Sequence, residues 1–327
     1  MSLLMRSLLV LVALTACQPV TAPALPWQPI MVTLEPLALD RDRNPEPGTA
    51  RIRDLRGFRL TSDDPRFGGL SGAVWQDGHL YAVSDRGTIF RATPKFDDQG
   101  LLTNLYDWRA ASLEAPDIRR AALDVEALAG DRPERLTIGL EDRQTLRHLD
   151  LRRDNAMMSR DGPATSFPDL SGNEGIEGLC SAPGGGWIAF SEAKPERDGY
   201  AVSWVDGRDA HTLSYRAAPD FKVTGADRIG DRIFVLERRF GFLSGWQSRI
   251  SMVNASDLTS PDARLIPQRL VHLRPPMHMD NFEAIATRKQ ANGLVTATLL
   301  SDDNFNPLQE TLLYDITIDV VTPDETG

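Results

Sequence analysis

The chain has 327 residues, of which 41% are hydrophobic and 25% charged, and its formal net charge at pH 7 is −10. This acidic balance leaves no electrostatic footprint for nucleic acid and favours a cationic partner, a metal ion or a substrate carried by a metal. A chain of this length buries roughly three quarters of its unfolded surface on folding, so a large core is available.

Residues 1–16 are predicted to be a signal peptide. Arg6 supplies a positive start, and the apolar run at residues 8–14 is too short to span a bilayer. The run ends in Leu14-Thr15-Ala16-Cys17, which resembles the lipobox of bacterial lipoproteins. That resemblance implies cleavage before Cys17 and attachment of lipid to Cys17. Ordinary signal cleavage after Ala16 is the alternative, but it requires a small residue in place of Leu14.

The residues after the lipobox suit a membrane anchor. Gln18, which stands where an aspartate would retain a lipoprotein, resembles the pattern of Gram-negative lipoproteins sent to the outer membrane. Residues 17–29 contain several prolines and alanines and are expected to form a tether to a folded domain at residues 30–327. We therefore expect an exported protein on the periplasmic or surface side that touches the membrane only through its lipid; its oligomeric state is left open.

From Leu70 onward the chain repeats one pattern five times. A polar residue opens a short apolar strand, a tight turn follows, and a second apolar strand ends at another polar residue; the stretch from Glu177 to Glu192 is the clearest copy. The opening residues of successive copies lie 47 to 59 positions apart. A repeat of about 40–50 residues that contains several short strands is typical of a β-propeller.

The predicted fold is therefore all-β, a β-propeller with five blades counted from the repeats. A sixth blade would need residues 30–39 together with strands that the pattern does not reveal. The last copy has no fourth strand of its own, and residues 51–60 form a spare N-terminal strand. Pairing of this strand with the C-terminal strand would close the ring and leave no long open edge.

The repeated polar residues are expected at one mouth of the central channel, because the first residue of a hairpin's first strand and the last of its second strand lie at the same end. The ten positions are Ser71 and Asp85, Glu126 and Glu141, Glu177 and Glu192, Thr224 and Glu237, and Glu283 and Asp302. Eight of the ten are carboxylates, whose repulsion must be offset by basic side chains or by a hard cation. Alternatively, they are structural and tie neighbouring blades by accepting backbone N–H groups.

Calcium is the cofactor that this composition favours, because it binds carboxylate, carbonyl and amide oxygens. The expected metal ligands are Asp85, Glu126, Glu177, Glu192, Glu283 and Asp302. Glu177 and Glu283 are also candidate catalytic residues. Arg86 and Arg238, which follow second strands, are expected to bind developing negative charge. His278 is a candidate base or phosphate ligand, with a bystander role as the alternative.

Six strings in order along the chain carry a family resemblance. They are GGLSGAVW…AVSDRG, DVEALAG, GNEGIEGL, FVLERR, DNFEAIA and LLSDDNFNPLQETLLYDI. They resemble the "esterase-like activity of phytase" family, or phytase-like domain, over residues 30–318. The resemblance implies a β-propeller that hydrolyses an ester or phosphoester. Calcium-dependent β-propeller phytases hold calcium, and through it phosphate, in an acidic mouth; this chain shares the acidic mouth, but their ligand motifs do not match it residue by residue.

The leading interpretation is a secreted, lipid-anchored hydrolase that acts on a small-molecule ester or phosphoester with calcium in its acidic mouth. A propeller that binds a ligand or a protein segment without chemistry is one alternative. A lactonase-like carboxylic ester hydrolase is the other. The sequence contains no G-x-S-x-G elbow, no phosphate-binding P-loop and no H-E-x-x-H zinc motif.

Overall fold

The computed structural model describes most of the chain after the N-terminal segment. The described residues are 27–39, 45–115, 117–119, 123–141, 144–151, 157–159, 162, 165, 167, 175–192, 200–206, 209–258 and 263–320. Within them the chain is built from β-strands, joined by a single 3-10 turn, η3 (Ala255–Asp257). No helix among these residues is long and apolar enough to cross a membrane.

The described strands form five sheets, which we number in the order of their innermost strands. The first sheet contains β5 (Leu70–Gln76), β6 (His79–Ser84), β7 (Thr88–Phe96), β8 (Leu102–Ser112) and β1 (Gln28–Pro29). The second contains β9 (Val125–Arg132), β10 (Arg135–Leu140), β11 (Thr145–Asp150) and β12 (Met157–Met158). The third contains β13 (Ile176–Ser181), β14 (Trp187–Ser191), β15 (Tyr200–Asp206), β16 (Asp209–Tyr215) and β20 (Arg264–Leu265).

The two remaining sheets combine late strands with strands from the start of the chain. The fourth sheet contains β17 (Lys222–Ile229), β18 (Arg232–Gly241), β19 (Gly245–Asn254), β21 (Gln268–Leu273) and β3 (Glu46–Pro47). The fifth contains β22 (Phe282–Lys289), β23 (Val295–Ser301), β24 (Leu312–Val320), β4 (Ala50–Thr61) and β2 (Thr33–Pro36).

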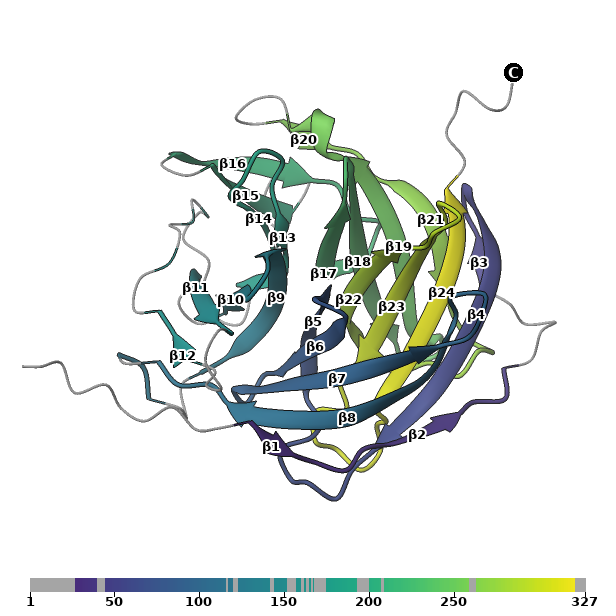
Figure 1. Cartoon of the computed structure of the whole chain (residues 1–327). Helices are drawn as coiled ribbons and strands as arrows, with labels where there is room; N and C mark the ends of the chain where they lie inside the picture. Colours follow the sequence, from purple (N-terminus) through teal and green to yellow (C-terminus); the bar gives the residue numbers. More distant parts are fainter. Residues whose placement is uncertain are drawn as a thin grey trace, which may run out of the picture.

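The sheets are arranged as in a β-propeller, with β5, β9, β13, β17 and β22 innermost (Figure 1). Buried apolar clusters fill the space between neighbouring sheets, so each sheet is covered on both faces. Strand β14 illustrates this arrangement. Ile188 and Phe190 pack in the cluster shared with the fourth sheet, whereas Trp187 and Ala189 pack in the cluster shared with the second. Successive side chains of a strand point to opposite faces, which explains the apolar runs in the inner strands.

Segments near the N-terminus add edge strands to several sheets. Residues 30–39, considered above as the start of a sixth blade, contain β2, which pairs with β4 in the fifth sheet. Just before them, β1 pairs with β8 in the first sheet. The strand expected at residues 51–60 is β4, and it pairs along β24 with Gly57 opposite Tyr314. The fifth sheet therefore joins strands from both ends of the described chain.

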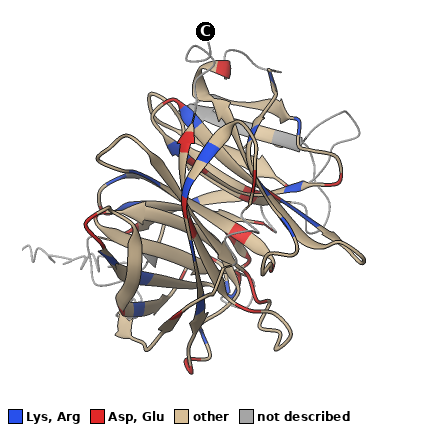
Figure 2. Ribbon diagram, turned by 90° about the vertical axis from the view of Figure 1, so that its right-hand side faces the viewer, with Lys and Arg blue, Asp and Glu red and all other residues tan. Residues whose placement is uncertain are grey.

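Charged side chains of both signs are distributed over the sheets. In the view of Figure 2, neither Lys and Arg nor Asp and Glu cover a whole face of the ribbon. This mixed pattern agrees with the absence of a basic footprint in the sequence. Carboxylates are concentrated locally, at one end of the inner strands.

Candidate functional site

The inner strand of every sheet has a β-bulge at the residue that opens the repeat. In the third sheet Ile176 pairs with Ser191 and Gly178 with Phe190, so Glu177 has no partner in β14. The same irregularity occurs in the other four sheets. The bulged residues are Ser71, Glu126, Glu177, Thr224 and Glu283. Bulges commonly re-aim a side chain beside a functional site, and the repeat places five of them at one end of the inner strands.

The pairing registers also show which residues at the ends of the second strands lie beside the bulges. The partners of the residues just before the bulges are Ser84, Leu140, Ser191, Glu237 and Ser301. One place further along the chain lie Asp85, Glu141, Glu192, Arg238 and Asp302. The expectation that Glu237 belongs to this level is wrong, because Glu237 pairs with Val223, the residue before the bulge, and the next residue, Arg238, stands at this level. Glu237 instead is fully buried and accepts a 2.7 Å hydrogen bond from the Tyr215 hydroxyl.

The two levels together form what we call the acidic ring. Its members are Asp85, Glu126, Glu141, Glu177, Glu192, Glu283 and Asp302. A repeated backbone hydrogen bond holds its outer level. The N–H groups of Asp85, Glu141, Glu192 and Asp302 donate to carbonyls of the residues two places before the bulges, at 2.9–3.1 Å. In two sheets that residue is a glycine, and a Cβ on Gly69 would come within 2.4 Å of Asp85 Oδ1.

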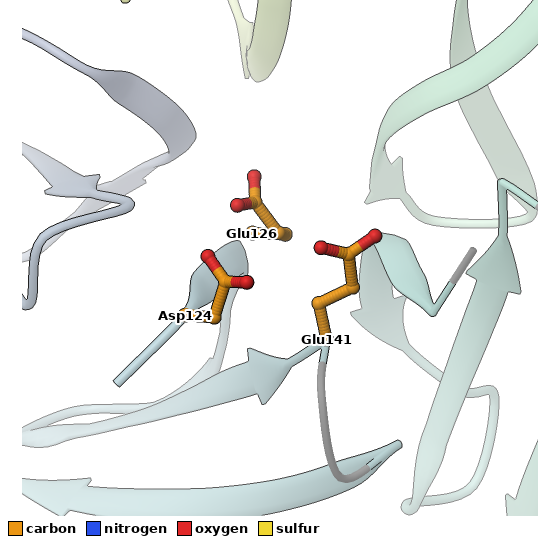
Figure 3. A group of neighbouring side chains, drawn as sticks. All are labelled: Asp124, Glu126 and Glu141. Atoms are coloured by element: carbon orange, nitrogen blue, oxygen red, sulfur yellow. The ribbon is translucent and has the colours of Figure 1, made fainter. Parts of the chain in front are cut away.

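Three carboxylates of the second sheet lie together at this end. A carboxylate oxygen from each of Asp124, Glu126 and Glu141 lies within 4.8 Å of the others. Figure 3 shows the three side chains converging from the start of β9 and the end of β10. Glu126 and Glu141 were expected at the mouth, whereas Asp124 was not considered. Its position two residues before the bulge is a signal that the sequence contained.

Burial and neighbouring charge act together on the inner carboxyls. Burial, and then the charges of Glu177, Glu283, Asp124 and Glu141, raise the pKa of Glu126 well above its usual range. Burial, followed by Glu283, Glu192 and Glu141, likewise raises the pKa of Glu177 well above its usual range. These groups hold protons at a pH where an exposed carboxyl would be ionised, and a cation placed among them would favour their charged forms.

Arg238 supplies the positive charge on the opposite side of the ring. Its guanidinium contacts the carboxylate of Glu283 and the side-chain oxygen of Asn281, and it donates to Glu192 at 3.3 Å. Lys222, which is paired with Arg238 across the strands, lies 3.0 Å from the other oxygen of Glu192. The ring is thus divided into a cationic side on the fourth sheet and a wholly acidic side on the second.

Asp302 and Asp85 occupy the ring between the fifth and first sheets. Burial, and then the charge of Glu283, raise the pKa of Asp302 to about 8. Burial also raises the pKa of Asp85, to which the hydroxyl of Ser84 donates at 3.0 Å. The adjacent Asp303 has a different role, because it accepts hydrogen bonds from Gly69 N–H and from the Thr311 hydroxyl. Asp303 therefore links the last sheet to the first.

The two bulged residues that are not carboxylates have a structural role. The Ser71 hydroxyl donates to the carbonyl of Val125, and the Thr224 hydroxyl donates to the carbonyl of Phe282 at 3.3 Å. Each hydroxyl thus binds the residue that precedes the carboxylate of another inner strand. Serine and threonine tie inner strands together here, which leaves the bulged glutamates as the residues that bring charge to the mouth.

Below the ring the channel is nearly filled. The cavity on the axis is lined by Ser71, Glu177 and small or apolar residues of all five inner strands, and its volume is only about 10 Å³. A Cβ on Gly72 would come within 2.7 Å of Leu128 N, and one on Gly225 within 2.7 Å of Glu283 O. A water molecule needs about 10–15 Å³. A ligand therefore reaches the carboxylates from the mouth and does not pass through the propeller.

The other predicted site residues lie in different surroundings. Arg86 stacks over the Phe305 ring, with its guanidinium carbon 3.5 Å from the centroid, next to Asp85 in the ring. His278 is half exposed and its ring contacts Glu310, so its contact is with a carboxylate outside the acidic ring. Cys17, the predicted lipidation site, lies outside the described residues.

The acidic side of the ring fits a hard divalent cation such as calcium. Asp124, Glu126 and Glu141 offer three oxygen ligands within reach of one ion, and calcium prefers carboxylate oxygens. Burial, and then the surrounding carboxylates, raise the pKa of Glu126, and a cation at this point would favour its charged form. Of the other expected ligands, Glu192 and Glu283 are paired with Arg238, and Glu192 also with Lys222, so that two cations offset their charge without a metal.

Comparison with solved structures finds broadly similar chains at low identity. A protein of unknown function from Dyadobacter fermentans is 13% identical, with 89% of this chain and 99% of that chain covered and a TM-score of 0.45. A luciferin-regenerating enzyme is 11% identical (81% and 95% covered, TM-score 0.44). An α-L-arabinofuranosidase from Clostridium thermocellum is 13% identical (80% and 95% covered, TM-score 0.42). No curated protein sequence matches the chain.

The sequence itself gives a more specific relationship. The model of the phytase-like family, described as "Esterase-like activity of phytase", matches residues 65–305. The matched region begins just before β5 and ends in the loop after β23, so it contains all five bulges and the whole acidic ring. The chain belongs to the phytase-like family.

Proposed function

We propose that this protein is a hydrolase of esters or phosphoesters that binds calcium on the acidic side of its ring. The observation that supports this most directly is the convergence of Asp124, Glu126 and Glu141 at a bulged strand end, in a chain of the phytase-like family. Asp303 is an example of a structural carboxylate, because it accepts hydrogen bonds from Gly69 N–H and the Thr311 hydroxyl. Glu141 also accepts a backbone bond, from Gly175 N–H at 3.4 Å, but one of its carboxylate oxygens lies with those of Asp124 and Glu126 within reach of a single ion.

The chain's own residues divide the work between the two sides of the ring. Asp124, Glu126 and Glu141 would hold the cation, which when bound lowers the pKa of a coordinated water and polarises a substrate oxygen. Glu177 lies between the two sides, and burial raises its pKa well above the usual range, which favours the protonated form that a proton donor to a leaving group needs. Arg238 and Lys222 provide the positive edge that would hold an anionic group of the substrate. Glu283 contacts Arg238 and keeps it in place.

The closure of the propeller, the export of the chain and its lipid anchor belong to the same proposal. We propose that the five sheets are blades of one closed ring, which the β4–β24 pairing closes with strands from both ends of the described chain. The chain would be exported, carry lipid on Cys17 and stand on the outer membrane by its tether, as the Leu14-Thr15-Ala16-Cys17 string suggests. The domain would then act on a small molecule in the periplasm or at the cell surface.

A carboxylic ester or lactone is the second candidate substrate, and it rests on the same arrangement. The positive charge that contacts the acidic ring comes from Arg238, with Lys222 beside it. One buried arginine that is already paired with carboxylates is a modest anion site compared with what a highly phosphorylated substrate would need. This favours a substrate with few negative charges over one with many.

A panel of esters tests the proposal. Purified protein would be assayed with 4-nitrophenyl phosphate, inositol hexakisphosphate, 4-nitrophenyl acetate and a lactone, each with calcium and with EDTA. We expect turnover of at least one substrate that calcium supports and EDTA abolishes, and that Glu126→Gln reduces at least tenfold, roughly the loss of one metal ligand's contribution. Asp98→Asn, an exposed carboxylate between β7 and β8 at the opposite end of the first sheet, serves as the control. Absence of turnover on the whole panel would favour a binding propeller instead.

A further inference from the structure

The β18–β19 hairpin projects beyond the acidic ring. In the first sheet the corresponding hairpin closes at once, with Ser84 paired with Thr88. In the fourth sheet the equivalent pair is Glu237 with Arg249, and pairing continues for four more residues to Gly241 opposite Gly245. At about 3.3 Å per residue, the hairpin extends about 13 Å past the level at which the first sheet turns.

One face of this extension continues the surface that carries Arg238. Side chains alternate between the faces of a hairpin, and directly paired residues share a face. Phe240 lies two residues after Arg238 and pairs with Trp246, so these side chains lie on the face that Arg238 turns to the ring. The Arg238 guanidinium stands 5.4 Å from the centroid of Trp246, which confirms the shared face. The intervening Arg239 bonds to Gln247 and stacks over Phe221 on the other face.

The side chains of Phe240 and Trp246 form an aromatic wall directly above the acidic ring. The centroids of Phe240 and Trp246 are 4.7 Å apart, and Phe240 leaves 60% of its surface exposed. Trp246 is partly buried and Phe240 packs against it at the solvent surface, so this aromatic surface is available to a ligand or a partner. Because the aromatic wall is continuous with Arg238, it indicates a ligand whose apolar part contacts the wall and whose polar end lies at the acidic ring.

We propose that Phe240 and Trp246 bind a flat apolar or aromatic ring of the substrate while its ester or phosphoester group lies at the acidic ring. This rests on the proposed function and narrows its substrate class to esters of cyclic, apolar alcohols or acids. Ligand sites commonly combine such apolar walls with a few polar groups that fix orientation. Phe242 and Leu243, at the tip beyond the paired strands, are 95% and 97% exposed and are not part of this wall.

Binding, measured apart from turnover, tests the inference. The affinities of 1-naphthyl phosphate and of inorganic phosphate would be measured by calorimetry, with and without calcium, for the wild type and for variants. We expect 1-naphthyl phosphate to bind more tightly than phosphate, and Phe240→Ala to weaken only the naphthyl compound, by about two- to tenfold, the range for one aromatic contact. Trp246→Phe should keep most of that preference and Trp246→Ala should lose it.

Phe242→Ala is the matched control, because it removes the same side chain from the same hairpin outside the wall. Equal effects of Phe240→Ala and Phe242→Ala, or no preference for the naphthyl compound, would overturn the inference. Binding of phospholipid vesicles that depends equally on Phe240 and Phe242, without any change in ligand affinity, would overturn it too and show a membrane-contacting tip. If the aromatic preference holds but no ester is turned over, the proposed hydrolysis fails and the ligand class stands.

Discussion

The guanidinium of Arg238 in β18 contacts the carboxylate of Glu283 in β22, across two neighbouring sheets. Arg238 stands at the level where the other four sheets place Asp85, Glu141, Glu192 and Asp302. The fourth sheet thus contributes the cation that partly balances the carboxylates of the other sheets. An arginine at the position where the other four copies have a carboxylate explains how so many acids can share one end of the inner strands.

Removal of that cation should destabilise the protein. Arg238→Gln leaves Glu283 and Glu192 without their buried partner, and breaking such a pair from one side costs about 3–5 kcal/mol. Urea unfolding at pH 7 measures the loss, which should shrink at pH 5 as the carboxyls take up protons. Arg239→Gln, a neighbour whose side chain bonds to Gln247 on the other face, should cost about 1 kcal/mol or less. Equal losses for the two variants would contradict a special role for Arg238.

Stability without metal should fall as the pH rises from 5 to 8. The pKa of Asp302 is raised from its usual 3.8 to about 8, so the folded state binds more protons than the unfolded state between these values. The contribution of Asp302 is therefore fully present below pH 4 and is lost as the pH rises through 8. Asp302→Asn should flatten the profile of unfolding free energy against pH in EDTA. A wild-type profile that rises over this window would show that the carboxyls are stabilised as anions.

The pairing of β4 with β24 should be essential for the whole domain. In this pair Gly57 lies opposite Tyr314 and Ala50 opposite Val320. A chain that begins at Gly57 loses the first seven residues of β4 together with the edge strands β1, β2 and β3, and because every sheet packs on its neighbours the entire domain should unfold at a lower temperature. A chain that begins at Thr49 also lacks β1, β2 and β3 but retains all of β4, and it is the control. Equal melting temperatures of the two chains would show that the β4–β24 pairing does not close the ring.

Cys17 should be the first residue of the mature protein and should carry lipid. Cys17→Ser removes the only thiol of the Leu14-Thr15-Ala16-Cys17 string, so the variant should be unprocessed or soluble in the periplasm. Detergent phase separation of cell extracts measures this, with Cys180→Ser, a buried cysteine far from the string, as the control. Partition of the wild type into the aqueous phase together with Cys17→Ser would refute the anchor.

The sequence predicted the strands and the fold class because the apolar runs repeat with a constant internal order. It also predicted that Glu126, Glu177 and Glu283 open inner strands at one end. It did not predict the bulges, because the pairing register depends on which residues of the two strands meet and leaves no mark in a single strand. For that reason Glu237 was placed in the ring instead of Arg238.

The split of residues 265–273 into two strands could not be predicted from local pattern either. β20 pairs in parallel with β16 of the third sheet, whereas β21 pairs with β19 of the fourth. The chain thus crosses between sheets at Ile266 and Pro267, between β20 and β21, and only the packing of distant strands decides this. Asp124 could have been named as a candidate from the sequence, because the repeat places a polar residue two positions before Glu126 as it does before Glu283. In the latter case that residue is Asn281, which contacts Glu283.

The most direct test of the central claim is a calcium titration of the melting temperature of the wild type and of Glu126→Gln. A bound ion adds RT ln(1 + [L]/Kd), about 2.7 kcal/mol at a hundredfold excess over Kd. Calcium should therefore raise the melting temperature of the wild type and EDTA should lower it, while Glu126→Gln should respond much less. In EDTA the variant should be as stable as the wild type or more so, because it relieves repulsion from Glu177 and Asp124. A wild-type melting temperature that ignores calcium and EDTA alike would contradict a metal site in the acidic ring.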